Sequence, residues 1–242
     1  MSENLKATVI KGNNAKEKDK NILLFSLEKG KIWVTFKGVR GDKAKMKYAK
    51  EQFCFGEYMI EEGKFSNVVT GVDIIEDFNE IAKDIDKYFE ANAMLEVVQN
   101  LDFESVYQRY EVFMALLNGF KILAFHRSAR LAVLLKFFLS VFEIYGVKLY
   151  SPKCAGCRAE FHDNIYINHQ VGELVCEACK TYQCEQIGKG EFNLIKLLST
   201  MPYDKLPNFP EEVGQKVLKI LIKNFYNRFD KNLKFIGILN NI

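Results

Sequence analysis

The sequence lacks several features that would assign it to other classes of protein. It has no cationic start followed by an apolar block and a small-residue cleavage site, so we expect no secretory signal and a cytoplasmic protein. Its longest apolar stretch, residues 131–142, is interrupted by Lys136 and falls short of the roughly 20 residues that a membrane-spanning helix needs. A GxxxxGK(S/T) phosphate-binding loop is also missing, so ATP-driven remodelling is not expected.

Histidine is scarce, with three residues, and tryptophan occurs once. A zinc-dependent nucleobase deaminase needs a His-x-Glu motif and a Pro-Cys-x-x-Cys motif. Here Cys154 follows Lys153, and His162 precedes Asp163 and Asn164. The sequence therefore excludes that class of enzyme.

The chain does have ample apolar material for a core, since 48% of its 242 residues are hydrophobic and 13% are aromatic. Its net charge of +3 hides two opposed segments. Residues 1–50 hold thirteen Lys and Arg against five Asp and Glu, whereas residues 51–100 hold three against twelve. The first segment therefore carries +8 and the second −9, which places the basic surface near the N-terminus.

Five short strands with turn residues between them are predicted in the first 75 residues, at 5–10, 22–26, 32–37, 53–60 and 68–75. Gly30 and Gly63 lie in predicted turns, and Asn13 and Asn14 end the first strand. Five strands in so short a segment favour a small closed barrel of the OB kind. An SH3-like barrel would give nearly the same pattern.

The hydrophobic period changes from 2 to about 3.6 after residue 75, which predicts helices. Phe78, Ile81, Ile85, Tyr88, Leu95 and Val98 share one predicted helical face. A second helix covers residues 106–120, and a third has Ser128 as its expected N-cap and stops at Gly146. Pro210, followed by two glutamates, resembles another helix start.

Two CxxC pairs, separated by eighteen residues, form the strongest local motif. Cys154 and Cys157 make the first pair, and Cys176 and Cys179 make the second. Two tight turns at this spacing can direct four thiolates at one Zn²⁺ ion in a zinc ribbon or a similar knuckle, and Gly156 gives the first turn conformational freedom. Because four protein ligands leave no open coordination position, we expect one structural zinc per chain and no catalytic metal.

Other interpretations of the cysteines remain open at this point. The pairs could hold no metal, or one pair could be a redox dithiol, although a redox motif needs one pair only and a βαβ context. Cys184, His169 or His162 could replace one of the four ligands. Cys54 lies in a predicted strand and is expected in the core.

A cluster of cations lies between residues 29 and 50, where eight Lys and Arg accompany one acid, Asp42. Because side chains alternate on a strand, Ile32, Val34 and Phe36 should point into the barrel, which leaves Trp33 on the outer face beside lysines. This combination suits base stacking in a cationic groove. The predicted nucleic-acid-binding residues are Lys31, Trp33, Lys37, Arg40, Lys43, Lys45 and Lys47. The alternative is a solvated lysine-rich loop, with Trp33 covered by the helical domain.

The segments 16–26 (KEKDKNILLFS), 28–32 (EKGKI) and 36–40 (FKGVR) resemble the N-terminal signature of the RecO family of recombination mediators. An OB-like barrel, a helical domain and a late four-cysteine knuckle extend this resemblance over essentially the whole chain. Lys37 and Arg40 match the basic KG-x-R segment of the family, whereas Gly41 and Asp42 stand where a further cation is common.

The resemblance implies a non-enzymatic DNA repair and homologous recombination factor. It implies binding of single- and double-stranded DNA, annealing of complementary strands, partnership with RecR, and help in loading RecA onto DNA coated by single-strand-binding protein (SSB). Some members of the family lack the cysteines, so the zinc is interpreted as support for the fold.

The sequence thus predicts an α+β protein with an N-terminal five-stranded OB-like β-barrel, a bundle-like helical domain and a four-cysteine zinc-knuckle insertion. The expected segments are the barrel (1–75), the first part of the helical domain (76–150), the zinc module (151–186) and the C-terminal helical part (187–242). One alternative is a metal-dependent enzyme acting on nucleic acid through Asp73, Glu76 and Asp77, although helix capping already explains these acids. Another is a zinc-ribbon interaction module of the transcription machinery.

Overall fold

The computed structural model describes residues 2–14, 19–38, 46, 48–64, 66–162 and 164–234. The chain divides into two compact units. The barrel unit consists of Met1–Ile85 and Asp102–Met114, and the helical unit consists of Asp86–Leu101 and Ala115–Ile242. These two compact units do not test the four segments expected from the sequence, so that division stays a prediction.

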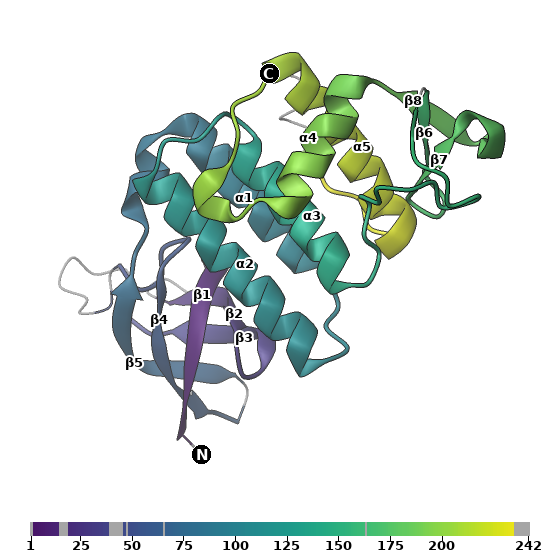
Figure 1. Ribbon diagram of the computed structural model, residues 1–242. Helices are drawn as coiled ribbons and strands as arrows, with labels where there is room; N and C mark the ends of the chain where they lie inside the picture. The colour runs from purple at the N-terminus through teal and green to yellow at the C-terminus, as the bar shows by residue number, and fades with distance from the viewer. Residues whose placement is uncertain are drawn as a thin grey trace. The chain divides into compact units, whose positions relative to one another are not determined.

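The barrel unit contains the five predicted strands (Figure 1). They are β1 (Ser2–Asn14), β2 (Lys20–Ser26), β3 (Gly30–Phe36), β4 (Phe55–Glu62) and β5 (Asn67–Glu76). They form a closed barrel in the order β1-β2-β3-β5-β4, with β4 pairing back to β1. All pairs are antiparallel except β3 and β5. This order, closed by one parallel pair, is the arrangement of an OB fold and decides between the two barrels that the sequence left open.

Alternation along the strands builds the barrel core. Ile22, Leu24, Val34 and Phe36 point inward and are buried, as the period of 2 predicts. Tyr58 is also fully buried, and its hydroxyl donates a hydrogen bond to the Ala49 carbonyl at 2.9 Å. A buried hydroxyl without such a partner would cost about 1–3 kcal/mol, so this bond allows a tyrosine in the core.

The outer face of β2 is covered at one point by the segment Asp102–Met114, which belongs to the same unit. Phe25 stacks on Phe103 with ring centroids 5.0 Å apart and packs against Phe113 at 5.4 Å. Arg109 Nε donates to the Leu27 carbonyl at 2.7 Å. Aromatic packing therefore buries Phe25, although it points away from the barrel interior.

The predicted helix after residue 75 is interrupted. A short 3₁₀ helix, η1 (Asn79–Lys83), comes first, and Asp84 then has an extended backbone with φ of −125° before α1 (Ile85–Asn100) begins. Ile85, expected on the buried face, is 66% exposed. Phe78 and Ile81 are buried as expected, so the expectation of one continuous face is wrong at Ile85, where the extended backbone of Asp84 interrupts the helical period.

The remaining helices are α2 (Val106–Phe125), α3 (Ala132–Ile144), α4 (Lys189–Thr200), the 3₁₀ helix η3 (Tyr203–Lys205) and α5 (Glu211–Phe229). In the helical unit α3, α4 and α5 pack against one another. Most residues of α3 are buried, which explains the apolar run of residues 131–142 as a core helix. Pro210 precedes α5 as predicted, whereas α4 had no sequence prediction of its own. No described helix is long and apolar enough to cross a membrane.

The start of α3 differs from the prediction that Ser128 caps it. The N-cap is Leu131, in the left-handed region with φ of 68°, and its own side chain makes no capping bond. Glu90 of α1 supplies the acceptor instead, because its Oε1 atom accepts a hydrogen bond from the Leu131 N–H at 2.8 Å. The cap therefore comes from a residue 41 positions earlier, which local sequence rules do not consider.

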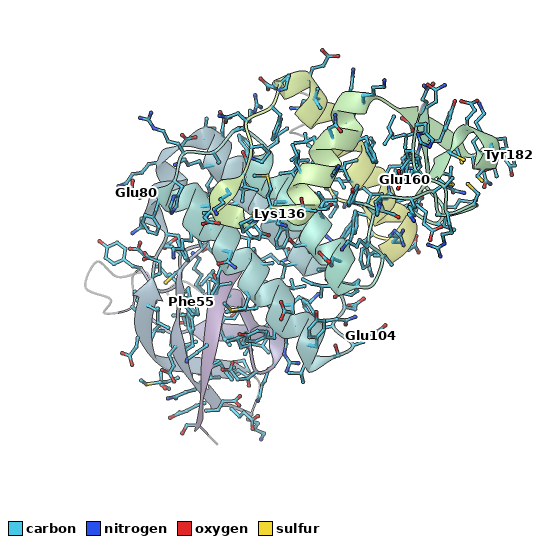
Figure 2. All side chains as sticks on the ribbon, in the orientation of Figure 1. Phe55, Glu80, Glu104, Lys136, Glu160 and Tyr182 are labelled. Atoms are coloured by element: carbon cyan, nitrogen blue, oxygen red, sulfur yellow. The ribbon has the colours of Figure 1, made fainter. Side chains whose placement is uncertain are left out.

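A small sheet lies between α3 and α4 in the chain. Its strands are β6 (Ile165–Asn168), β7 (Glu173–Cys176) and β8 (Cys184–Ile187), in the order β7-β6-β8. The 3₁₀ helix η2 (Glu177–Cys179) directly follows β7. Tyr182, in the loop before β8, is 94% exposed (Figure 2). This sheet carries the second CxxC pair.

Candidate metal centre and nucleic-acid interface

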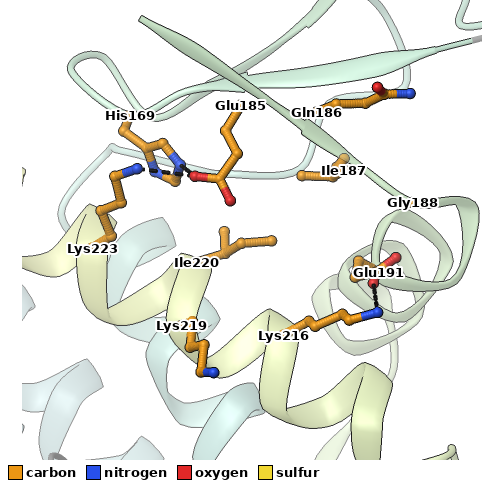
Figure 3. A pocket seen from close by; sticks show the side chains of 10 residues that line it. All are labelled: His169, Glu185, Gln186, Ile187, Gly188, Glu191, Lys216, Lys219, Ile220 and Lys223. Atoms are coloured by element: carbon orange, nitrogen blue, oxygen red, sulfur yellow. Dashed lines mark hydrogen bonds and ion pairs between the residues drawn. The ribbon is translucent and has the colours of Figure 1, made fainter.

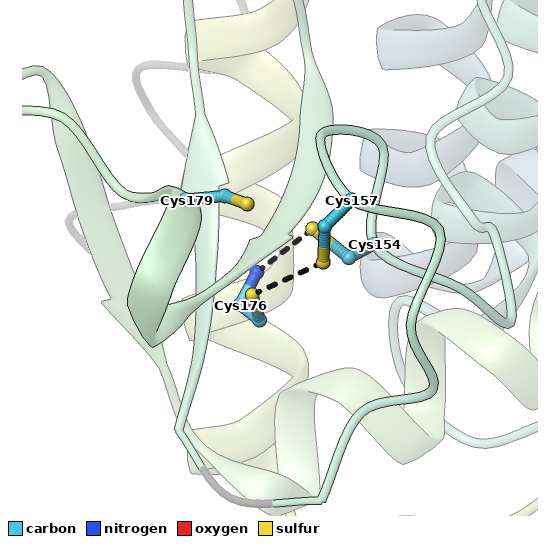
Figure 4. A group of neighbouring side chains, drawn as sticks. All are labelled: Cys154, Cys157, Cys176 and Cys179. Carbon is cyan, nitrogen blue, oxygen red and sulfur yellow. Dashed lines mark hydrogen bonds between the residues drawn. The ribbon is translucent and has the colours of Figure 1, made fainter.

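The two CxxC pairs face each other at the β7 edge of the small sheet (Figure 4). Cys154 and Cys157 lie in a turn closed by a hydrogen bond from the Cys154 N–H to the Ala159 carbonyl at 2.8 Å. Cys176 ends β7 and Cys179 ends η2. The main chain joins the two parts, because the Ala155 N–H donates to the Leu174 carbonyl at 3.0 Å.

The four sulfur atoms are close enough to bind one metal ion. All four lie within 4.8 Å of one another, and the Sγ atoms of Cys157 and Cys176 are 3.7 Å apart. A tetrahedral zinc site with Zn–S bonds of about 2.3 Å has S–S edges of about 3.8 Å. The donor set and its spacing therefore fit a Zn²⁺ ion.

The electrostatics of the cluster favour a bound cation. Burial opposes ionisation of Cys154, but backbone N–H groups of Cys157, Cys176 and Gly156 lower its pKa to about 6. The Cys179 thiol donates hydrogen bonds to the neighbouring sulfurs, of Cys157 first, and these bonds raise its pKa to about 12. Four thiolates can coexist at this spacing only if a positive ion lies among them.

Position 156 has no room for a side chain, because Cys179 lies directly beside it. A Cβ atom on Gly156 would lie 2.9 Å from Cys179 Sγ and 3.0 Å from Cys179 Cβ, closer than real Cβ contacts. The sequence interpretation assigned this glycine to turn flexibility, yet it is Arg158 that adopts a positive φ, of 65°. The glycine lets the first CxxC turn approach the second pair.

The other candidate ligands lie outside the cluster. Cys184 Sγ accepts a hydrogen bond from the Thr181 N–H at 3.3 Å, and His162 is exposed. His169 is buried, with its Nε2 atom 2.9 Å from Glu185 Oε2. Within the described residues, the metal-ligand geometry therefore belongs to the four predicted cysteines. Cys54 is buried in the barrel core as expected, and burial raises its pKa to about 11.

The outer face of β3 carries the predicted tryptophan. Trp33 is 47% exposed, whereas its neighbours Val34 and Phe36 are buried and Ile32 is partly buried. Lys37 is exposed, and Lys31 Nζ lies 5.8 Å from the centre of the Phe103 ring. The predicted alternation of side chains is therefore correct, and Trp33 offers a ring face at the surface of the barrel unit.

Lys11 joins this surface from β1, a residue that the sequence analysis did not single out. The register pairs Lys11 with Leu23 and Leu23 with Trp33, so the three residues form one row across three strands. Lys11 Nζ lies 5.8 Å from the centre of the Trp33 ring. The signal that could have found it is the strand register, which depends on a bulge between Val9 and Lys11.

The next row on this face is polar. It consists of Asn13, Asn21 and Thr35, and the Thr35 hydroxyl donates to Asn21 Oδ1 at 3.0 Å. The outer face of β1, β2 and β3 thus presents an aromatic ring, cations and hydrogen-bonding groups, which are the side-chain types that bind bases and phosphates. The remaining predicted cations lie outside the described residues: Arg40, Lys43, Lys45 and Lys47.

Two of the carboxylates considered as catalytic groups, those of Glu76 and Asp77, accept hydrogen bonds from backbone N–H groups close to them in the chain. Glu76 Oε1 accepts the Asp77 N–H at 3.1 Å, and Asp77 Oδ1 accepts the Asn79 N–H at 3.1 Å. They organise the junction between β5 and η1 through local hydrogen bonds, whereas the N-cap of η1 is Phe78 and makes no side-chain capping bond. In the described part of the chain, these acids and Asp73 are not gathered into a metal-binding group.

A closed OB barrel with a tryptophan and lysines on its face, in one chain with helices and a four-cysteine cluster, defines the class: an OB-fold protein with a four-cysteine knuckle. Comparison with known families agrees with this class. Residues 1–78 match the family described as "Recombination protein O N terminal", and residues 82–234 match "Recombination protein O C terminal".

Curated relatives match over nearly their full length. "DNA repair protein RecO" of Clostridium novyi (strain NT) is 25% identical, over 97% of this chain and 93% of that protein. The protein of the same name from Acetivibrio thermocellus is 26% identical, over 97% of this chain and 96% of that protein. The chain belongs to the RecO family of DNA repair proteins.

Proposed function

We propose that this protein is a recombination mediator that binds single- and double-stranded DNA through the outer face of β3 and anneals complementary strands without ATP. It works in the cytoplasm at the nucleoid, where RecR is its partner and the two assist loading of RecA on SSB-coated DNA. The protein performs no chemistry on its substrate. The observation that carries the proposal is the row formed by Lys11, Leu23 and Trp33 on the barrel face.

Physical chemistry supports this row as a contact for DNA. A half-exposed indole ring offers its face to a nucleobase, and stacking on an aromatic side chain contributes about 1–3 kcal/mol per base. Lys11 supplies positive charge beside the ring, and Lys31 and Lys37 flank Trp33 along the chain and add positive charge for phosphates. Such interactions bind every sequence, as an annealing factor requires, because phosphates carry no base identity.

Annealing follows from the same interactions. Bound cations reduce the repulsion between two phosphate backbones, and bases stacked on an open barrel face stay available for pairing. The energy comes from base pairing itself, so no nucleotide hydrolysis is needed.

Trp33→Ala tests the interface. We expect the dissociation constant for single-stranded DNA to rise roughly five- to hundredfold, which corresponds to the loss of one stacked base. Tyr182→Ala is the matched control, because Tyr182 is also an exposed aromatic residue but lies in the zinc module. Equal affinities for the wild type and Trp33→Ala would contradict the proposed interface.

We also propose that the metal is a single structural Zn²⁺ held by Cys154, Cys157, Cys176 and Cys179. Thiolates select soft or borderline metals, and a four-sulfur tetrahedral set is typical of zinc. When bound, the ion would offset the repulsion among the crowded thiolates and would tie the first CxxC turn to β7 and η2. Metal analysis of protein purified without chelator is the test, with one equivalent of zinc expected.

Two assays separate this function from the alternatives. A nuclease that uses Mg²⁺ would degrade the DNA, whereas a mediator leaves both strands intact. Specific retention of the protein on immobilised RecR is expected of a mediator. Mg²⁺-dependent cleavage by purified protein, absent from a mock preparation, would overturn the proposal.

A further inference from the structure

A cavity of about 460 Å³ lies inside the helical unit, between the small sheet and the last helix (Figure 3). Strand β8 and the first residues of α4 form one wall, and α5 forms the other. It contains none of the four cysteines and none of the residues of the proposed barrel interface.

The α5 wall is cationic. Lys216, Lys219 and Lys223 follow one another at helical spacings of three and four residues, so they project from one face over about 10 Å. All three side chains are exposed. Tyr226, which is 45% exposed, continues the same face three residues further along.

The opposite wall is acidic but largely neutralised. Glu185 of β8 lies 2.9 Å from Lys223 Nζ and 2.9 Å from His169 Nε2. Glu191 lies 3.8 Å from Lys216 Nζ, which also lies 2.7 Å from Glu212 Oε1 on α5 itself. Lys219 makes no ion pair among the residues that the structure describes. With three lysines, two glutamates and a His169 ring whose pKa is lowered mainly by burial, the lining has a net charge of +1 near neutral pH.

The apolar part of the lining is small. Ile187 and Ile220 face the cavity but are only 5% and 6% exposed, so they offer little surface for the side chains of a peptide. Lysine is a good point-charge partner for phosphate, and a row of ammonium groups suits successive phosphates of a strand better than one isolated carboxylate. The exposed ring of Tyr226 adds a surface on which a base could stack.

We propose that this cavity is a second anion-binding site that takes the phosphate groups of a nucleic-acid strand. Two separate binding sites, one in each unit, would let one molecule hold two strands during annealing. The strand as ligand rests on the proposed function, whereas the presence of a phosphate site in the helical unit does not.

Lysine footprinting locates the ligand. The full-length protein is acetylated with and without oligothymidylate, inorganic phosphate or thymidine monophosphate, and each lysine is quantified by mass spectrometry. We expect oligothymidylate to slow acetylation of Lys219 several-fold relative to Lys196, an exposed lysine of α4 that does not line the cavity. Equal protection by the mononucleotide at equal phosphate concentration would overturn the strand assignment. Protection by none of these, or by an acidic peptide alone, would overturn the phosphate site.

Charge variants give an independent measurement. Lys216→Gln, Lys219→Gln and Lys223→Gln together should reduce the slope of log K against log salt for single strands by about 0.7 for each phosphate that loses its lysine partner. The matched control removes the same charge elsewhere in the helical unit: Lys189→Gln, Lys196→Gln and Lys205→Gln. Lys219→Glu alone leaves every described ion pair intact and covers the case in which the triple variant fails to fold. An unchanged slope in both folded variants would refute the site.

The barrel variant keeps the two proposals distinguishable. If Trp33→Ala leaves DNA binding unchanged but protection of Lys219 persists, the barrel interface fails and the α5 site stands. If Trp33→Ala weakens binding but oligothymidylate never protects Lys219 in the wild type, the α5 site fails and the barrel interface stands.

Discussion

Replacing Glu90 with glutamine should change how the stability of the helical unit depends on pH. Burial raises the pKa of Glu90 from 4.5 to about 7, although the backbone N–H groups of Leu131 and Leu134 oppose the shift. Oε2 has no hydrogen-bond partner among the described residues. Because the folded state prefers the protonated form, the native protein loses stability as the pH rises from 4.5 to about 7.

The size of this loss follows from the shift. Each pKa unit corresponds to about 1.4 kcal/mol, so a shift from 4.5 to about 7 amounts to about 3 kcal/mol, reached above pH 7. Glutamine cannot ionise, and its carbonyl oxygen can still accept the Leu131 N–H. Glu90→Gln should therefore match the wild type near pH 4.5 and exceed it by up to about 3 kcal/mol at pH 8.

Urea unfolding of both proteins at pH 5 and pH 8, followed by far-UV circular dichroism, measures the difference. Glu143→Gln is the control, because Glu143 is an exposed carboxylate of α3, and its effect should stay within about 0.5 kcal/mol at either pH. A wild type and a Glu90→Gln variant with the same change in unfolding free energy between the two pH values would refute the reasoning.

Three further predictions concern the metal and the basic segment. The Cys154→Ser and Cys176→Ser variants should each lose the zinc and unfold the small sheet, because structural zinc contributes roughly 10–16 kcal/mol to folding in small zinc peptides. DNA binding by the barrel should survive. Elemental analysis measures the zinc, and limited proteolysis detects the unfolded sheet. Gly156→Ala should weaken zinc retention against a chelator, because its methyl group would contact Cys179; retention equal to that of the wild type would contradict the packing argument. Substituting Lys37, Arg40 and Lys43 together should lower the slope of log K against log salt for duplex binding by about 0.9 for each phosphate that is no longer neutralised. An unchanged slope would mean that the DNA-binding cations lie elsewhere.

The sequence predicted the features that depend on local periodicity and spacing. The five strands followed from alternation, and the grouping of four cysteines followed from two CxxC turns. Pairing between strands was harder, because it depends on interactions between distant residues. The parallel pairing of β3 with β5 identified the OB arrangement, and no local pattern encodes it.

Three features required tertiary structure. Glu90 caps α3 from another helix, Lys11 reaches Trp33 across an intervening strand, and Gly156 makes room for Cys179. In each case the partners are neighbours in space only. Local rules therefore favoured Ser128 as the cap and turn flexibility as the reason for the glycine.

The central claim is tested most directly by annealing of SSB-coated complementary strands, followed by fluorescence quenching without ATP. The wild type should speed pairing on naked and coated strands. A variant without the barrel cations and Trp33 should be slower, and addition of RecR and RecA should redirect the wild-type complex towards filament formation. Equal annealing rates for the wild type, the variant and buffer would contradict the mediator function, even if DNA binding were intact.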